Sequence, residues 1–383
     1  MLRGPGNGSL FHLYISDMHR RLLLILFILT SFGLRGQSIR HISSAEGLNN
    51  PTVYSIVQDP WGFVWIGTRD GLYKYNEGRA ASFSFLDSTV NRRSNNVQSL
   101  LVTKDSTLII GLQLGGIVGV DLKVLRPIND SLLPQLPRNI SIISLHQDNE
   151  GTLWAGSSGL GAFQLKAGSK SWERLQSQDF NEDLKFIFDF ADQGDTLWVA
   201  TSGGVFSYDE SNESIQNFTI VDGLAAVAAS SVTVDSNRSL VWVGFSDGTL
   251  NSIHSDTGVI QTFRDIQRAD QFSDRGVNEI VVLGDSLFIA MAFGVVVFDP
   301  SRNEVIDSYS RLGSLPPASE VRDIHIESSV AGTPTIWAAT ESGVARAPLH
   351  GVNLQDPSSW EIEDAGFSEA SLSILSLESL EGV

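Results

Sequence analysis

A short apolar run, centred on an aromatic or isoleucine anchor, returns seven times along this chain of 383 residues. The first copy reads VWIGT, the third LWAGS and the fourth LWVAT, and successive anchors are 44 to 49 residues apart. A strand-rich period in the forties is typical of β-propellers, in which each repeat forms a blade of about four strands. The anchors are Trp65, Ile109, Trp154, Trp198, Trp242, Phe288 and Trp337.

The spacing within each copy supports the same fold. Two residues after each anchor stands glycine or alanine, because a bulky side chain near the axis would collide with the next sheet. Four residues further on, six copies have glycine, which can adopt the positive φ that a turn between the second and third strands requires. The third copy has Leu160 there, between Gly159 and Gly161. The six turn glycines are Gly71, Gly115, Gly204, Gly248, Gly294 and Gly343.

We therefore predict an all-β fold, a seven-bladed β-propeller of four-stranded antiparallel blades over residues 38–365. In the first copy, residues 53–58 form the inner strand, 64–68 the second and 72–75 the third. Seven copies fit one closed ring, and closure matters because an open sheet edge is an aggregation liability. Two segments are candidates for the outer strand of the last blade, Ser359–Asp364 and the N-terminal Ser38–Ser43, and the sequence does not choose between them.

The C-terminal segment begins another copy. Residues 373–383 read SILSLESLEGV, which resembles the inner strand and turn that begin at Ser141. We predict that residues 366–383 are the truncated start of a further blade or of a second propeller. Of the two explanations, a fragment of a longer protein and an incomplete eighth blade, we favour the fragment.

The N-terminus has the pattern of an export signal. Basic residues follow Met18, an apolar run extends from Leu22 to Leu34, and a small residue, Gly36, follows. We predict a signal peptide over residues 18–36, the alternative being an uncleaved anchor. The run is shorter than the roughly 20 residues of a spanning helix, and the mature residues contain no other run of that length. The mature protein is thus expected to be periplasmic or secreted.

Composition excludes several classes of protein. The formal net charge is −18, and such a surface repels phosphate backbones, so nucleic acid is not expected as a partner. The chain has no cysteine, which excludes disulfides, thiolate metal sites, a cysteine nucleophile and a lipobox anchor.

The first copy resembles the repeat of two-component regulator propellers. It contains Glu46–Gly47–Leu48, the turn Asp59–Gly62, the strand Trp65–Thr68 and the triplet Asp70–Gly71–Leu72 followed by an aromatic residue. The third and fourth copies share the motif, whereas the second, sixth and seventh keep only the spacing. The resemblance implies a periplasmic sensor of glycans, often with a second propeller, a membrane span, a histidine kinase and a receiver further along the chain. None of those signalling motifs occurs in these residues.

We predict that ligands bind at the rim where the turns between second and third strands meet, because loops on a rigid scaffold commonly carry binding residues. Arginines in the connection between the first two blades could hold acidic groups of a glycan. The same residues would also suit a protein partner. The candidates are Arg69, Asp70, Arg92, Arg93, Gln113, Ser158, Ser202, Asp247, Phe293 and Glu341.

No catalytic motif stands out. His146 and His325 fall in inner strands and could face the axial channel, as in propeller lyases, but no histidine pair has metal-ligand spacing. Trp61 is the tryptophan most free to bind a ligand. We therefore expect no catalysis, metal or cofactor in these residues. The leading hypothesis is a carbohydrate-sensing propeller with an oligosaccharide ligand; the alternatives are a secreted or surface propeller that binds proteins and, less favoured, a propeller lyase.

Overall fold

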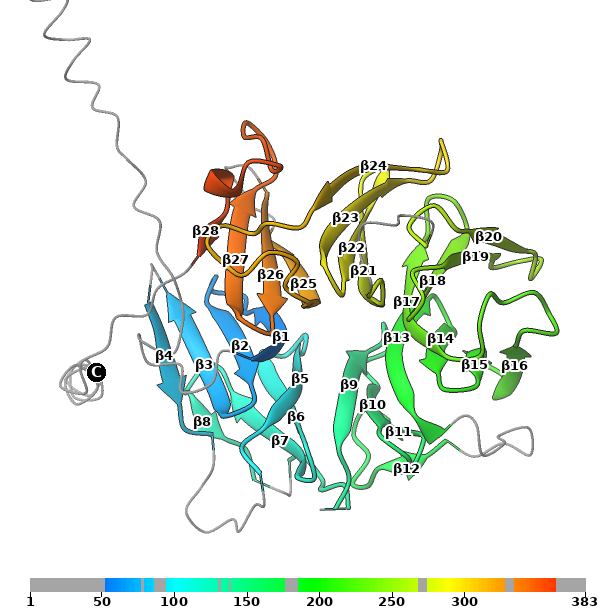
Figure 1. The fold of residues 1–383 in the computed structure, drawn as a ribbon. Coiled ribbons are helices and arrows are strands. Elements are labelled where there is room, and N and C mark those ends of the chain that lie inside the picture. Colours follow the sequence, from blue (N-terminus) through cyan, green and yellow to red (C-terminus); the bar gives the residue numbers. More distant parts are fainter. Residues whose placement is uncertain are drawn as a thin grey trace, which may run out of the picture. The chain divides into compact units, whose positions relative to one another are not determined.

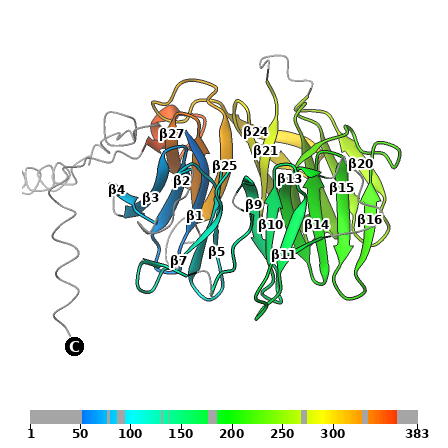
Figure 2. The ribbon, with the colours of Figure 1, turned by 90° about the horizontal axis from the view of Figure 1, so that it is seen from below.

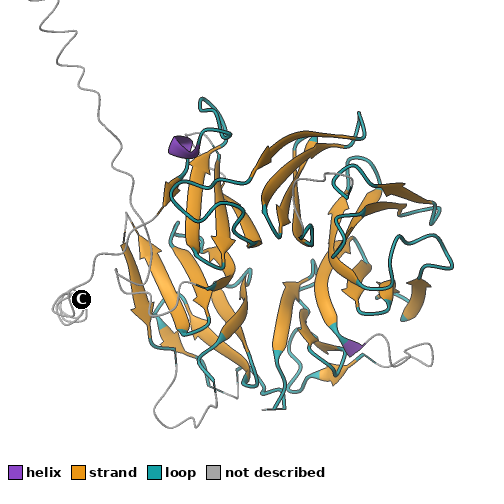
Figure 3. Cartoon of the chain, viewed as in Figure 1, coloured by secondary structure: helices purple, strands orange, loops and turns teal. Residues whose placement is uncertain are grey.

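Four-stranded antiparallel sheets are arranged radially around a common axis (Figures 1 and 3). The computed structural model describes residues 52–76, 79–85, 94–129, 132–137, 139–175, 185–267, 274–327 and 334–362. These residues form seven such sheets, so the predicted seven-bladed β-propeller is confirmed. All of them belong to one unit, Arg40–Val383.

The first four blades follow one another along the chain. Blade one contains β1 (Val53–Gln58), β2 (Val64–Thr68), β3 (Gly71–Asn76) and β4 (Arg79–Phe83). Blade two contains β5 (Val97–Val102), β6 (Thr107–Leu112), β7 (Gly116–Asp121) and β8 (Arg126–Pro127). Blade three contains β9 (Ile142–Gln147), β10 (Leu153–Ser157), β11 (Ala162–Leu165) and β12 (Glu173–Arg174). Blade four contains β13 (Ile187–Gln193), β14 (Thr196–Thr201), β15 (Gly204–Asp209) and β16 (Ser214–Phe218).

The last three blades repeat this order. Blade five contains β17 (Ala229–Asp235), β18 (Leu240–Phe245), β19 (Leu250–His254) and β20 (Ile260–Phe263). Blade six contains β21 (Val277–Leu283), β22 (Ser286–Met291), β23 (Gly294–Asp299) and β24 (Glu304–Tyr309). Blade seven contains β25 (Val321–Glu327), β26 (Thr335–Thr340), β27 (Gly343–Pro348) and β28 (Glu361–Ile362), with a short 3₁₀ turn, η3 (Pro357–Ser359), before the last strand.

Each blade is a meander that runs outward from the axis, and Figure 2 shows the strands side by side from a second direction. The inner strands contact one another in chain order, and β1 also contacts β25, so the first and last blades meet. The outer strand of blade seven is β28, which pairs with β27. The alternative segment, Ser38–Ser43, lies outside the described residues.

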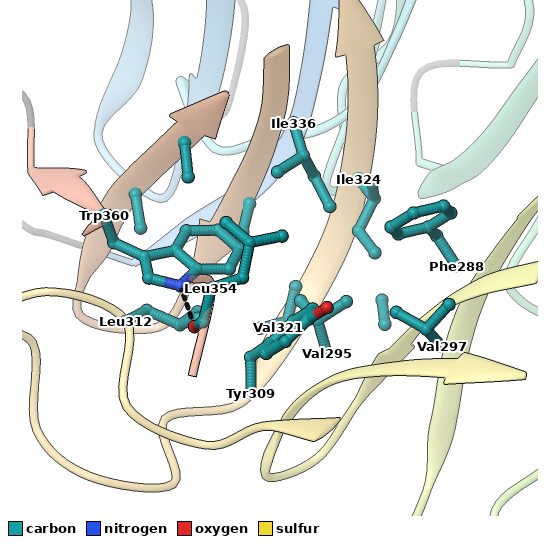
Figure 4. Close-up of a cluster of buried hydrophobic side chains, with 14 of the residues drawn as sticks. Phe288, Val295, Val297, Tyr309, Leu312, Val321, Ile324, Ile336, Leu354 and Trp360 are labelled. Atoms are coloured by element: carbon teal, nitrogen blue, oxygen red, sulfur yellow. Dashed lines mark hydrogen bonds between the residues drawn. The ribbon is translucent and has the colours of Figure 1, made fainter. Parts of the chain in front are cut away.

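Apolar side chains fill the space between consecutive blades. Each of the seven interfaces holds its own buried cluster, and the cluster between blades seven and one joins Trp337 to Val53 and Tyr75. Figure 4 shows the cluster between blades six and seven, in which the Trp360 indole donates a hydrogen bond to the Leu354 carbonyl oxygen at 2.8 Å. The core is therefore a ring of interfaces, each made by burial of apolar area.

The predicted anchors are all nine-tenths buried or more, and each packs against the following blade. The predicted close approach of the sheets is also present. A Cβ added at Gly156 would lie 2.7 Å from the Ile187 side chain of blade four, and one added at Gly244 would lie 2.3 Å from Val277 of blade six. These positions therefore admit only small residues.

The turn glycines behave as predicted in five of the six copies. Gly71, for example, has φ +151° and Gly248 has φ +82°. Blade two differs, because its turn is longer: Leu114 and Gly116 have positive φ, and Gly115 is not among the positive-φ residues. Leu112 pairs with Gly116 in blade two, whereas Thr68 pairs with Gly71 in blade one.

Two predicted segments lie outside the described residues, the signal peptide at 18–36 and the truncated blade at 366–383, and both remain predictions. In the part of the chain that the structure describes, no helix has the length and apolar character needed to cross a membrane.

Candidate functional site

A cavity of about 700 Å³ opens on the axis at the end of the ring where the inner strands begin. Inner strands of six blades line it: β1, β5, β9, β13, β21 and β25. The same end carries the turns between second and third strands, because the Arg69 amide donates a hydrogen bond to the Thr52 carbonyl at 3.2 Å and equivalent bonds occur in other blades. The ring therefore presents a hollow at the centre of the face where binding was predicted.

A β-bulge shapes the mouth of this cavity. In all seven inner strands the register shifts after the first paired residue, which leaves the second residue without a partner on the neighbouring strand. Most of these second residues line the cavity. They are Tyr54, Gln98, Ile143, Phe188, Asn278 and Arg322.

The third residue of every inner strand is polar and forms a ring around the axis, here called the axial ring. Its members are Ser55, Ser99, Ser144, Asp189, Ser231, Glu279 and Asp323, and all except Ser231 line the cavity.

Several members of the axial ring connect neighbouring blades. Asp189 accepts a hydrogen bond from the amide of Val232 in blade five at 2.9 Å, and Asp323 accepts one from the amide of Ile56 in blade one at 2.7 Å. Such bonds satisfy inner-strand amides that would otherwise be unpaired. These two carboxyl groups therefore have a structural role.

Burial raises the pKa of the three acids of the axial ring. It raises the pKa of Asp189 to about 7 and that of Asp323 to about 6, because the enclosed ring disfavours the charged form. The pKa of Glu279 is raised well above its ordinary value by burial and then by repulsion from the other two carboxylates. Among the described residues, no group of three or more His, Cys, Asp or Glu side chains is arranged to hold a metal ion.

The cavity wall also holds aromatic side chains and one guanidinium group. Phe188 is 37% exposed and stacks on Phe186, which is 42% exposed, with 6.5 Å between ring centroids. Arg322 lies over the Tyr54 ring, and its Nε and Nη2 atoms donate hydrogen bonds to one carboxylate oxygen of Glu320 at 3.0 and 2.8 Å. The wall thus combines stacking surfaces with hydrogen-bonding groups, as small-molecule sites commonly do.

Seven of the ten predicted site residues lie on turns at this end of the ring, and none of the seven lines the cavity. Their turns lie on the face where the cavity opens, and most of their side chains are exposed. Gln113 is connected to the wall through Asn96, which donates a hydrogen bond to the Gln113 amide oxygen at 2.8 Å and accepts one from Gln98 of the wall. Those exposed or partly exposed are Arg69, Asp70, Gln113, Ser158, Ser202, Asp247 and Glu341.

Three predicted site residues differ from this arrangement. Phe293 is only 3% exposed and belongs to the core between blades five and six, so its ring is not available at the rim. In blade six it is the preceding residue, Ala292, whose amide bonds back to the start of the inner strand. Arg92 and Arg93 lie outside the described residues.

The two inner-strand histidines do not line the axial cavity. His146 points between blades three and four, where its Nε2 atom is 2.9 Å from Asp192 and its ring stacks on Phe190. His325 is partly buried, and the resulting loss of solvation lowers its pKa. Trp61 is exposed by 51%, in the turn between the first two strands and so at the opposite end of blade one.

Sequence reasoning missed the axial ring, although its signal was present. The third residue of each inner strand is serine, aspartate or glutamate in all seven copies, and an apolar residue follows it in every copy. Our sequence alignment was centred on the second strands, where the apolar signal is stronger. A polar residue that recurs at an inner-strand position points toward the axis, and this pattern could have located the cavity.

The fold and the cavity define a β-propeller with a polar axial pocket, and family models agree with this class. The model of the two-component regulator propeller matches residues 47–70, which contain most of the motif on which the resemblance was based, so that resemblance is confirmed. The model of the N-terminal β-propeller domain of the TSS9 protein PorZ matches residues 197–361, most of blades four to seven. No curated protein sequence matches the chain.

Solved structures share the fold at low sequence identity. The extracellular domain assigned to a hybrid two-component system of B. thetaiotaomicron is 17% identical, with a TM-score of 0.65 over 82% of this chain, and a second such domain is 19% identical, with a TM-score of 0.63 over 80%. This chain spans only 40% and 41% of those two proteins. Virginiamycin B lyase of Staphylococcus aureus is 15% identical, with a TM-score of 0.61, and the match covers 80% of this chain and 97% of the lyase.

Proposed function

We propose that this chain is a non-catalytic, extracytoplasmic ligand-binding propeller, the sensing part of a two-component signalling protein, and that its ligand is a carbohydrate bound in the axial cavity. The observation that carries the proposal is the cavity itself, in which the exposed ring of Phe188 stands beside hydrogen-bonding side chains. The resemblance of the first blade to two-component regulator propellers and the fold shared with extracellular sensor domains support it.

The cavity suits a sugar of one to a few rings. A sugar presents an apolar CH face that an aromatic ring can cover, and Phe188 offers such a surface at the wall. Its hydroxyl groups would find partners in Gln98 and Asn278, which lie at the mouth, and in the serines of the axial ring.

Isothermal titration of the full chain against a panel of neutral and acidic oligosaccharides tests this proposal. We expect at least one binder and an affinity at least about tenfold lower for Phe188→Ala, because the stacking surface is lost. Trp61→Ala is the matched control, since it removes an exposed aromatic side chain from the opposite end of blade one, and it should bind like the wild type. Equal loss in both variants, or unchanged affinity in Phe188→Ala, would contradict the site.

A second candidate function is that of a secreted or surface propeller that binds other proteins. It is favoured by the longer family match, since the PorZ model covers 197–361 and the sensor repeat only 47–70. Surface proteolysis of intact cells separates the two: a surface platform is cleaved, whereas a periplasmic sensor is protected.

A lyase function is supported least. The likeness to virginiamycin B lyase concerns the fold. The two histidines on which that hypothesis depended do not line the axial cavity.

A further inference from the structure

Glu279 differs from the other acids of the axial ring. Asp189 and Asp323 each accept a hydrogen bond from an amide of the following blade. Glu279 occupies the same position in blade six and is longer by one methylene group, and none of the described residues hydrogen-bonds to its carboxyl group. A carboxyl group enclosed without a donor is costly when it is ionised. Hydrogen bonds between blades therefore account for an acid at the positions of the two aspartates, but they do not account for an acid at position 279.

The charge around Glu279 is strongly one-sided. Among the described residues that line the cavity, four are acidic and one is basic. The basic residue, Arg322, forms an ion pair with Glu320 through two hydrogen bonds. Among the described residues, the three acids of the axial ring are thus left without a compensating cation in the cavity wall, and His146, between blades three and four, adds only a favourable interaction with Asp189.

The wall supplies a second feature that fits a cation. Phe188 is exposed at the mouth and its neighbour Asp189 lines the cavity, so an aromatic face stands near the acidic ring. Organic ammonium groups bind well where an aromatic face and a carboxylate are combined, because the ring quadrupole and the negative charge both attract them. The cavity wall already contains one cation–π contact, because the Arg322 guanidinium lies 4.8 Å from the centroid of the Tyr54 ring.

We propose that the axial cavity takes a ligand that carries a primary ammonium group, and that Glu279 is its counter-ion. The inference rests on the proposed function in placing a ligand in this cavity, and it adds the chemical class of that ligand. The ammonium donates to the Glu279 carboxylate, and the apolar part of the ligand lies against Phe188. A cavity of about 700 Å³ is far larger than a metal ion needs. Its volume suits an organic amine, such as an amino sugar of two rings.

Binding should release a proton, and calorimetry can measure that release. Burial and repulsion raise the pKa of Glu279, so the carboxyl group tends to hold its proton in the unliganded ring. An ammonium group beside it favours the charged form and lowers that pKa. Binding therefore transfers the Glu279 proton to the solvent, and affinity rises with pH until the free carboxyl group is ionised.

The experiment is calorimetric titration of the full chain in two buffers of different ionisation enthalpy. The probes are chitobiose, which has primary amines, its diacetylated form, which is neutral, and spermidine, an amine without a sugar. We expect chitobiose to bind with proton release and the diacetylated sugar to bind at least about tenfold more weakly. Glu279→Gln should weaken chitobiose binding at least about tenfold and abolish the proton release.

Asp285→Asn is the control, because it removes one negative charge from the turn at the far end of β21 and should bind like the wild type. Binding of spermidine but of no sugar would support the inference and contradict the carbohydrate part of the proposed function. Equal binding of both sugar forms, with no effect of Glu279→Gln, would overturn the inference and leave the proposed function standing. Absence of binding by either amine would also overturn it, whatever the neutral and acidic sugars do.

Discussion

At the scale of single residues, the apolar and small positions were predicted from the sequence, whereas the polar positions on the axis were missed. Trp154 and Gly156 each follow from burial, because one fills the interface and the other allows the next sheet to approach. Phe293 misled us because a turn residue in one copy was assumed to be exposed as in the others. The raised pKa of Glu279 could not be predicted from the residues next to it in sequence, because it depends on burial and on two carboxyl groups that are distant in sequence.

The acids of the axial ring should make stability fall as pH rises. A carboxyl group whose folded pKa is raised keeps its proton in the ring at a pH where the unfolded chain has released it, so ionisation favours unfolding. With folded pKa values of about 6 for Asp323 and about 7 for Asp189, this loss should occur between about pH 4 and pH 7.

The test is the free energy of unfolding, measured with urea at several pH values in that range. Glu279→Gln has no proton to lose at this position and removes repulsion from the ring, so its free energy of unfolding should decrease less than that of the wild type between about pH 4 and pH 7. Parallel pH profiles for the two proteins would show that Glu279 does not titrate as described.

At the scale of elements, the turn after β1 and the following strand β2 form one hydrogen-bonded unit in blade one. One carboxylate oxygen of Asp59 accepts hydrogen bonds from the amides of Trp61 and Phe63 at 3.0 Å, and the other accepts one from the Trp65 indole at 2.9 Å. Asp148 repeats the arrangement with Trp154 in blade three. Sequence spacing predicted the turn and the anchor, but it could not show that the aspartate joins them.

Asp59→Ala should therefore destabilise the ring by about 2–4 kcal/mol, because it removes the turn bonds and leaves a buried indole N–H without an acceptor. Asp121→Ala is the control, since among the described residues the Asp121 carboxylate accepts only from the exposed amide of Lys123, and it should cost less than about 1 kcal/mol. Denaturant unfolding measures both, and equal losses would refute the role given to the Asp59 unit.

At the scale of the whole molecule, the period of the repeat predicted the number of blades and their closure. Seven copies gave seven sheets among the described residues, and β1 meets β25 as a closed ring requires. The strand that completes blade seven could not be chosen from the sequence, because both candidates have suitable patterns. The axial cavity was missed as well, because its walls come from six strands and only a comparison of their third residues could have located it.

The measurement that tests the account most directly is a crystal structure of the full chain with chitobiose. The account predicts sugar density in the axial cavity, with one amine within hydrogen-bonding distance of the Glu279 carboxylate and one ring against Phe188. Density on the rim turns near Arg69 or on the outer faces of the blades, with the cavity unfilled, would contradict it.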